Sequence, residues 1–313
     1  MKNKICFLFL LIISNLAAKA QQDPQFSFYK QARLIYNPGF AGTSRAISGL
    51  ILNRYQWSGI EGAPKTMVFS VESSTEILGV KSGIGLNIIR DELGFENNTL
   101  VNLNYAYQGQ TNFGDLGIGT SLGIFNKAID GDWYVPSGSS YHNLNDGLLP
   151  SGSVSQVAID IGFGLFLKST NYFAGISVTH INQAKITFSD DAYTFYTRHY
   201  YFTGGYTIQT PNPLFSLQPS VLYKTDLAGS QLDLNADVTY NERFTAGIGY
   251  RIGDGLLFSF NVELQNGLKA GYAYDLTTSA LGAYSSGSHE LYLSYSFAVQ
   301  KNRNKKYKSV RYL

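Results

Sequence analysis

Apolar and polar side chains alternate at every second position in many segments of this chain. In one segment Val101, Leu103 and Tyr105 alternate with Asn102 and Asn104. Successive side chains of a β-strand point to opposite faces of the sheet, so each such segment has one apolar face and one polar or small face. Segments of about ten residues can cross a bilayer at a tilt, whereas strands of soluble sandwiches are usually shorter. The pattern therefore predicts strands that span a membrane.

The alternating segments number about fourteen, an even count that lets an antiparallel sheet close and lose its free edges. We expect strands at 45–55, 66–73, 82–90, 97–109, 113–126, 157–167, 171–180, 199–208, 214–224, 230–240, 243–252, 256–265, 267–275 and 288–299. The predicted fold is all-β, a transmembrane antiparallel β-barrel of the outer-membrane type that comprises residues 45–300.

The links between the predicted strands alternate in length. Those at 56–65, 127–156, 181–198 and 276–287 are long, and most links at the opposite end of the barrel are short. Outer-membrane barrels have long extracellular loops and short periplasmic turns, so we expect both chain termini in the periplasm of a Gram-negative bacterium. The link at 74–81 departs from this rule because it is too long for a periplasmic turn, and the links at 225–229 and 253–255 depart from it because they are short.

The first twenty residues, 1–20, have the features of a cleavable export signal. Lys2 and Lys4 precede a short apolar run, and the small-residue pattern that ends at Ala20 makes Gln21 the expected mature start. The run is too short to be a spanning helix. The chain's one cysteine, Cys6, lies in this signal, so the mature protein is expected to have neither a disulfide nor thiolate chemistry.

Composition and charge exclude little beyond nucleic-acid binding. The mean hydropathy of −0.08 resembles that of a soluble protein, but a barrel conceals its hydrophobicity in alternation. Loss of Lys2, Lys4 and Lys19 with the signal changes the net charge from +2 to −1, which gives no reason to expect nucleic acid as a partner. The tail at 301–313 is basic without an acid, and is either a solvated end or a contact for an acidic partner or anionic lipid.

The inward face of the predicted strands is rich in glycine and charge. The glycines in this register are Gly83, Gly85, Gly117, Gly119, Gly123, Gly162, Gly164, Gly247 and Gly249. They either allow curvature and close packing within the wall or leave room in the lumen for a guest chain. The inward charged residues are Asp160, Asp233, Asp237, Arg251, Glu263, Lys269 and Asp275. Charged side chains are common in a water-filled lumen, so we assign these residues no catalytic role.

Motifs for catalysis or metal binding do not fit their context. A G-x-S-x-G match at 119–123 lies inside a predicted strand, whereas a nucleophile elbow needs a strand-to-helix turn. The histidines, His142, His180, His199 and His289, lack metal-ligand spacing. We therefore expect no catalytic, cofactor-binding or metal residues and no enzyme activity, with a lipid-modifying barrel enzyme as the least favoured alternative.

Residues 21–44 precede the first predicted strand and form an extended segment with two prolines and several aromatic residues. The sequence reads Gln22-Asp23-Pro24-Gln25-Phe26-Ser27-Phe28-Tyr29 and then Tyr36-Asn37-Pro38-Gly39-Phe40-Ala41-Gly42. Aromatic side chains bury a large area at low entropic cost, and prolines pre-extend the chain. We expect a strap that lies in or across the periplasmic mouth of the barrel, anchored by Phe26, Tyr29 and Phe40.

Here the chain resembles the PorP/SprF family of type IX secretion outer-membrane proteins, whose mature sequence typically starts DPQFSQY and continues with an NPAYAG-like stretch. The resemblance continues in order through Arg54-Tyr55-Gln56-Trp57, Pro64-Lys65-Thr66, Gly83-Ile84-Gly85, 91–94 and His180-Ile181-Asn182. Partner-binding residues are expected among the matched positions: Asp23, Pro24, Gln25, Phe26, Tyr29, Asn37, Pro38, Phe40, Gly42, Arg54, Trp57, Pro64, Lys65, His180 and Asn182.

The resemblance implies a non-enzymatic barrel that works with the secretion or gliding apparatus of Bacteroidota. Its expected partners are a large secreted cargo, often an adhesin, with a C-terminal sorting domain, the periplasmic components of type IX secretion, and outer-membrane lipid. The alternative is a passive outer-membrane channel or transporter for small or hydrophobic solutes.

Overall fold

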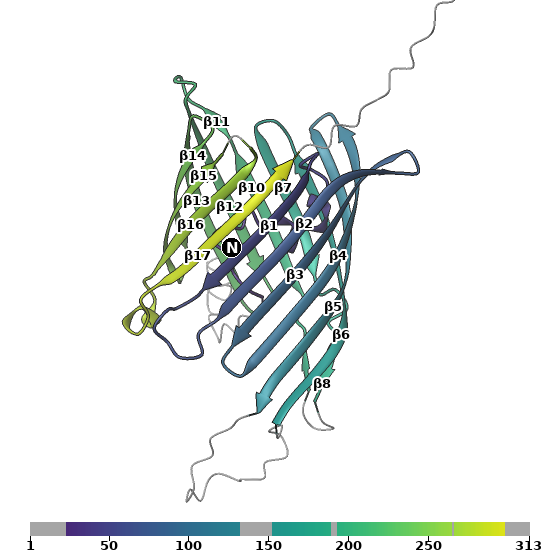
Figure 1. Ribbon diagram of the computed structural model, residues 1–313, viewed down its shortest axis with the longest axis vertical. Helices are drawn as coiled ribbons and strands as arrows, with labels where there is room; N and C mark the ends of the chain where they lie inside the picture. The colour runs from purple at the N-terminus through teal and green to yellow at the C-terminus, as the bar shows by residue number, and fades with distance from the viewer. Residues whose placement is uncertain (1–22, 132–151, 189–192, 265, 298–313) are drawn as a thin grey trace, which may run out of the picture.

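The computed structural model describes residues 23–131, 152–188, 193–264 and 266–297 (Figure 1). Its strands are β1 (Ile47–Tyr55), β2 (Lys65–Ile77), β3 (Val80–Leu93), β4 (Glu96–Thr111), β5 (Gly114–Gly131), β6 (Gly152–Lys168), β7 (Tyr172–Thr179), β8 (Lys185–Thr187), β9 (Tyr193–Phe195), β10 (His199–Tyr206), β11 (Ile208–Gln209), β12 (Phe215–Thr225), β13 (Ser230–Tyr240), β14 (Phe244–Arg251), β15 (Gly255–Glu263), β16 (Leu268–Thr277) and β17 (Ser288–Phe297). The helical pieces are α2 (Arg33–Tyr36), η1 (Pro38–Phe40) and η2 (Ala280–Ala283).

Within the described residues, fourteen strands form a closed antiparallel barrel, which confirms the predicted fold (Figure 1). Neighbours along the chain pair in order, β1 pairs with β17, and β10 pairs with β12. The short β11 adds to β12, and β8 and β9 form a separate two-stranded sheet. The barrel end where β1 begins and β17 ends is called the terminal end here, and the opposite end is called the loop end.

Every predicted strand has a counterpart in the barrel, but the turn after β2 corrects the prediction of a long link at 74–81. Strands β2 and β3 continue as a paired ribbon, with Glu76 opposite Lys81 and Ile77 opposite Val80. Only residues 78–79 remain as the turn. The alternation stops at the polar residues of this ribbon, which is why the sequence pattern ended the strands too early. The short turn removes this exception to the loop-length rule, whereas the links at 226–229 and 252–254 of the loop end are short and still depart from it.

The two faces of the wall divide as the alternation predicts. In β4, Leu103 and Tyr105 are exposed on the outside, whereas Asn102 and Asn104 are buried on the inside. The predicted lipid-facing residues Phe163, Leu234 and Phe260 are also exposed. Within the described residues, the structure holds no helix that is long and apolar enough to cross a membrane.

Residues 23–44 lie inside the barrel, and we call them the plug. The plug starts at the loop end, where Lys224 Nζ donates to the Asp23 carbonyl oxygen at 3.0 Å. It reaches the terminal end, where the Gly42 N–H donates to a carboxylate oxygen of Glu72 at 2.7 Å. This placement corrects the expectation of a strap in or across one mouth, because the segment runs along the lumen from one end to the other.

The register of β13 gives the first testable prediction. Leu234 points outward and its neighbour Asn235 points inward. We expect Leu234→Arg to cost about 2–4 kcal/mol near the bilayer midplane, measured as the free energy of unfolding in lipid vesicles. Asn235→Arg is expected to disturb the contents of the lumen while membrane insertion stays at the wild-type yield. Equal losses of insertion for both variants would contradict this register.

Candidate functional site: the plugged lumen

Aromatic side chains of the plug form a hydrophobic core inside the barrel. Phe26 and Tyr29 each expose 1% of their surface. The Phe28 ring packs edge-on against Tyr292 of β17 at 4.6 Å between centroids, and the Tyr36 ring lies 5.1 Å from that of Tyr201 in β10. Burial of one large apolar side chain contributes about 1.5–3 kcal/mol. The plug is therefore a packed layer of the fold.

Backbone of the plug approaches backbone of the wall at several inward glycines. A Cβ added at Gly83 would lie 2.0 Å from the Ala41 carbonyl oxygen, and one at Gly117 would lie 2.0 Å from the Gly39 carbonyl oxygen. Side chains do not fit in this space, so the guest-chain interpretation holds here, and the guest is the chain's own N-terminal segment. Other inward glycines instead contact side chains of the wall, which fits the packing interpretation: Gly123, Gly162, Gly247 and Gly249.

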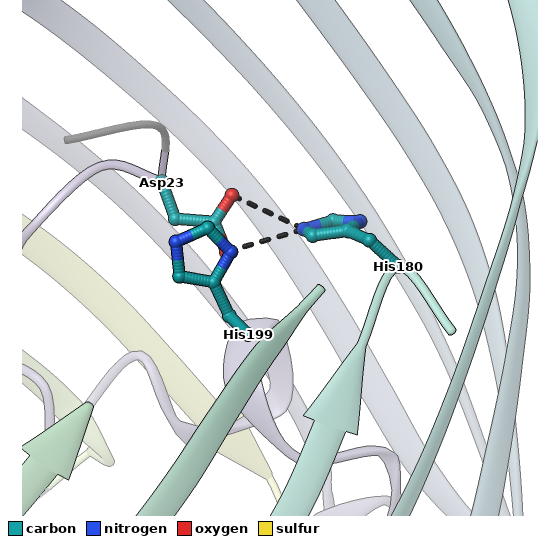
Figure 2. A group of neighbouring side chains, drawn as sticks. All are labelled: Asp23, His180 and His199. Atoms are coloured by element: carbon teal, nitrogen blue, oxygen red, sulfur yellow. Dashed lines mark hydrogen bonds and ion pairs between the residues drawn. The ribbon is translucent and has the colours of Figure 1, made fainter. Parts of the chain in front are cut away.

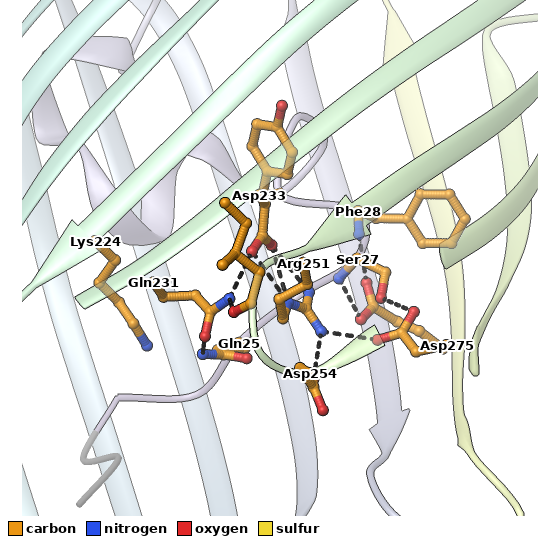
Figure 3. Close-up of polar contacts among 12 residues, drawn as sticks. Gln25, Ser27, Phe28, Lys224, Gln231, Asp233, Arg251, Asp254 and Asp275 are labelled. Carbon is orange, nitrogen blue, oxygen red and sulfur yellow. Dashed lines mark hydrogen bonds and ion pairs between the residues drawn. The ribbon is translucent and has the colours of Figure 1, made fainter. Parts of the chain in front are cut away.

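A buried ion network holds the first half of the plug (Figure 3). Glu290 accepts hydrogen bonds from the backbone N–H groups of Ser27 and Phe28, both at 2.8 Å, and from Arg54 Nη1 at 2.9 Å. Asp275 accepts from Ser27 Oγ at 2.6 Å and from Arg54 Nη2 at 2.7 Å. The side chains of Arg54 and Glu290 are almost fully buried, so their charges depend on these partners.

Arg251 extends this network along the wall. Its guanidinium contacts Asp275 at 2.9 Å, Asp233 at 3.0 Å and Asp254 at 3.4 Å (Figure 3). Carboxylates thus outnumber the guanidinium groups that face them, and the plug supplies the additional donors through its Ser27 and Phe28 groups. Buried charges are tolerated only when they are paired and hydrogen bonded, so the network is complete only with the plug in place.

At the terminal end the plug is held by backbone acceptors and aromatic faces. The Asn37 side chain donates to the Leu165 carbonyl of β6 at 2.9 Å and to the Ile176 carbonyl of β7 at 3.2 Å. The Arg33 guanidinium lies 4.0 Å from the centre of the Phe173 ring, a cation–π contact that is stronger when desolvated. These contacts fix the orientation of α2 and η1 against the wall.

The first described residue of the plug meets two histidines at the loop end (Figure 2). His180 follows β7, and its Nε2 lies 3.1 Å from both carboxylate oxygens of Asp23. Its Nδ1 lies 2.6 Å from an Asp160 oxygen. His199 Nδ1 lies 3.5 Å from Asp23 Oδ2, to which Tyr201 also donates at 2.6 Å. All these side chains are buried.

The charges of this cluster stabilise one another. Burial lowers the pKa of His180, but the charge of Asp23 and the hydrogen bonds that His180 donates to Asp23 and Asp160 outweigh it and raise that pKa to about 9. Burial raises the pKa of Asp23, but the charge of the protonated His180, its hydrogen bond to Asp23 and the charge of Lys224 hold that pKa well below its usual range. At neutral pH His180 is therefore expected to be protonated between two carboxylates.

A cavity of about 790 Å³ lies next to the cluster, and we call it the vestibule. Its lining combines plug residues such as Asp23 and Phe26 with wall and loop residues such as Trp57, Lys127 and Phe195. The vestibule has both apolar and charged walls, which is a surface suited to a polypeptide or another amphipathic guest.

The predicted partner-binding positions fall into three groups. Most contact the barrel from the plug or complete its ion network: Asp23, Gln25, Phe26, Tyr29, Asn37, Pro38, Phe40, Gly42, Arg54 and His180. Pro24, Trp57 and Pro64 line the vestibule. Lys65 and Asn182 are exposed and form the third group, and Asn182 donates to the Ile159 carbonyl. Direct contact of these residues with another protein stays a prediction.

Sequence patterns do not identify the wall residues that receive the plug. Glu290, His199 and Tyr201 lie far from Asp23 and Ser27 in the sequence, and no spacing connects them. Their signal was the inward register of a large charged or aromatic side chain, which alone does not identify a partner. The predicted inward charges Asp160, Asp233, Arg251 and Asp275 are buried on the inner face as expected, but they belong to specific ion networks and are not ordinary lumen charges.

The fold and the site together define an outer-membrane barrel that is filled by its own N-terminal segment. The family model described as "Type IX secretion system membrane protein PorP/SprF" matches residues 18–295. The chain belongs to this family and is a type IX secretion outer-membrane barrel. This family and fold are those of a secretion-system barrel and not of an enzyme class. No curated protein matches the sequence.

Solved barrels resemble the chain only distantly. The outer membrane protein Omp33 of Acinetobacter baumannii has 5% identity and a TM-score of 0.48 over 80% of this chain and 98% of its own. The toluene transporter TbuX of Ralstonia pickettii has 11% identity and a TM-score of 0.47 over 85% and 93%. A mutant porin of Rh. blastica has 11% identity and a TM-score of 0.34 over 80% and 99%. Likeness at this level supports no conclusion about function.

The Glu290 network gives the second testable prediction. Glu290→Ala removes the acceptor of two plug N–H groups and one of the two carboxylates that face Arg54, and loss of one partner of a buried ion pair costs about 3–5 kcal/mol. We expect hydrogen exchange at Ser27 and Phe28 to accelerate accordingly while the barrel keeps its heat-modified gel mobility. The control is Glu263→Ala, which removes an exposed pair with Lys269 worth about 0–1 kcal/mol. Unchanged exchange in Glu290→Ala would refute the role of this network.

Proposed function

We propose that this barrel is a non-enzymatic component of type IX secretion that helps export or surface-anchor one large, adhesin-like secreted protein through its C-terminal sorting domain. Family membership supports the secretion role. The observation that carries the proposal is the plug, which occupies the lumen from the loop end to the terminal end. A filled lumen suits a docking and anchoring component better than a pore.

The plug also argues against the passive channel that was the alternative. A channel for small solutes needs a continuous aqueous path, and in the described residues the plug packs its aromatic core and its backbone directly on the wall. In planar bilayers we therefore expect the wild-type protein to stay closed. A steady open conductance would favour the channel.

The two ends of the barrel suit different partners under this proposal. The vestibule opens among the long links of the loop end, which we assign to the cell exterior, and offers a surface for the cargo. The terminal end then faces the periplasm, where components of the secretion machinery meet the short turns. The outer face, with exposed residues such as Leu103 and Phe260, meets outer-membrane lipid.

The orientation gives the third testable prediction. Ser139, Asp191 and Lys305 would be natural labelling sites but lie outside the described residues. Ala228 is exposed in the turn after β12 at the loop end, and Asn112 is exposed in the turn after β4 at the terminal end. On intact cells, an impermeant thiol reagent is expected to label Ala228→Cys and to leave Asn112→Cys unlabelled until the outer membrane is permeabilised. The reverse pattern would invert the orientation.

The plug's part in cargo handling gives the fourth testable prediction. Phe26→Ala with Tyr29→Ala removes two buried rings of the plug. We expect the barrel to keep its heat-modified mobility and the amount of surface-exposed cargo to fall, because a loosened plug no longer shapes the floor of the vestibule. The matched control, Phe163→Ala with Phe260→Ala, truncates exposed aromatic residues on the outer face.

The outcomes of this comparison are distinct. Loss of the folded barrel in the plug variant would mean that the plug serves stability alone. Unchanged cargo with an intact barrel would remove the plug from cargo handling. Loss of cargo in the control as well would point to a general loss of barrel in the membrane.

A further inference from the structure

Three potential metal ligands converge at the loop end from separate parts of the chain (Figure 2). Asp23 comes from the plug, His180 follows β7, and His199 begins β10. One ligand atom from each side chain lies within 4.8 Å of the others, and all three residues are buried. The proposed function makes no use of this convergence.

Two of the three distances between these atoms are close to those of a tetrahedral metal site. Bonds of about 2.0–2.1 Å place neighbouring ligand atoms about 3.3 Å apart around a tetrahedral ion. Here His180 Nε2 and Asp23 are 3.1 Å apart, and His199 Nδ1 and Asp23 are 3.5 Å apart. The third distance, between the two imidazole nitrogens, is within 4.8 Å, so an ion could join the three ligands once the two imidazoles move closer together.

A carboxylate behind His180 holds the ring in a ligating orientation. Asp160 lies 2.6 Å from Nδ1, so Nε2 is directed at Asp23. Carboxylate–histidine–metal arrangements of this kind orient metal-bound imidazoles and raise their basicity. The backbone of His180 is left-handed, with a φ of 54°, a conformation that is uncommon outside glycine and that requires support from surrounding contacts.

We propose that Asp23, His180 and His199 bind one divalent transition-metal ion, and that Zn²⁺ is the expected species. Two imidazoles with one carboxylate suit zinc and its neighbours, whereas Mg²⁺ and Ca²⁺ prefer oxygen ligands. Binding releases the proton on His180 Nε2. It also requires that His199 Nδ1, which now lies 3.0 Å from the Thr197 carbonyl oxygen, pass its proton to Nε2 or to solvent. Three protein ligands leave a fourth position for water or for a group in the vestibule.

A metal ion at this site would cross-link the plug to the wall. Without metal, the first described residue of the plug is held by hydrogen bonds and an ion pair. With metal, it is also coordinated through residues from β10 and from the end of β7. Supply of the ion at the loop end would then set how firmly the plug is docked.

The test uses the full-length mature protein, purified with a tag that lacks histidine and freed of metal by a chelator that is then removed. Equilibrium dialysis against Zn²⁺ with metal analysis is expected to find one ion per chain. Asp23→Asn, His180→Gln and His199→Gln are each expected to lose more affinity than Asp160→Asn, which should lose about 10–100-fold as a positioning residue. The matched control is His289→Gln, because His289 contacts Tyr272 away from the cluster, and its affinity should equal that of the wild type.

The results of this test either support or overturn the proposed zinc site. If the wild-type protein takes up no Zn²⁺, or if the ligand variants bind Zn²⁺ like the wild type, the metal site is overturned. The cluster would then be only a buried ion pair. Folding of each variant is checked by heat-modified gel mobility. If none of the three ligand variants folds, X-ray absorption at the zinc edge of the wild-type protein decides: two imidazole ligands support the site and none overturns it. Loss of zinc with normal cargo export would leave the proposed function untouched.

Discussion

The bilayer core offers no hydrogen bonds to a backbone, and the whole structure follows from that constraint. Closure through the β1–β17 and β10–β12 pairs gives each of the fourteen barrel strands two neighbours. Closure also creates a lumen, which is the one place at membrane depth where polar side chains can lie. Each strand therefore sends apolar residues such as Leu103 outward and polar residues such as Asn104 inward. The alternation of apolar and polar residues in the sequence follows from this division.

Buried charges that line the lumen need opposite charges and hydrogen-bond partners, and the plug supplies hydrogen-bond donors. Glu290 is completely buried, and burial of an unpaired carboxylate is costly. Arg54 neutralises it in part, and the Ser27 and Phe28 N–H groups complete its hydrogen bonds. The same segment places its aromatic rings where the wall offers Leu52 and Val68. Plug and wall are complementary in charge, in shape and in apolar surface, so they form a single folded unit.

The barrel could be predicted from the sequence because each strand shows its own alternation of apolar and polar residues. The plug site could not be predicted, since the residues that form it are distant in the sequence. Alternation within one segment fixes which residues face inward, and it placed Asp160 and Asp275 correctly. It cannot say that Asp160 lies behind His180, or that Asp275 meets Ser27, since these contacts depend on the stagger of the strands and on the path of a segment without alternation. The expected strap at one mouth failed for the same reason: prolines and aromatic residues indicate an extended, buried segment but not the depth at which it docks.

A partner could either displace the plug or bind in the vestibule, and the contacts of the plug make these two routes differ in free energy. Removal of the plug would expose the Glu290 and Asp275 carboxylates without their N–H and hydroxyl donors and would leave backbone-width grooves at Gly83 and Gly117. A displacing guest would have to present the same donors and an equally narrow backbone at the same depth. Occupation of the vestibule demands neither, because this cavity already exists with the plug in place. The lower free-energy route for a partner is therefore to bind on top of the docked plug, with the segment around Asp23 as part of the surface it meets.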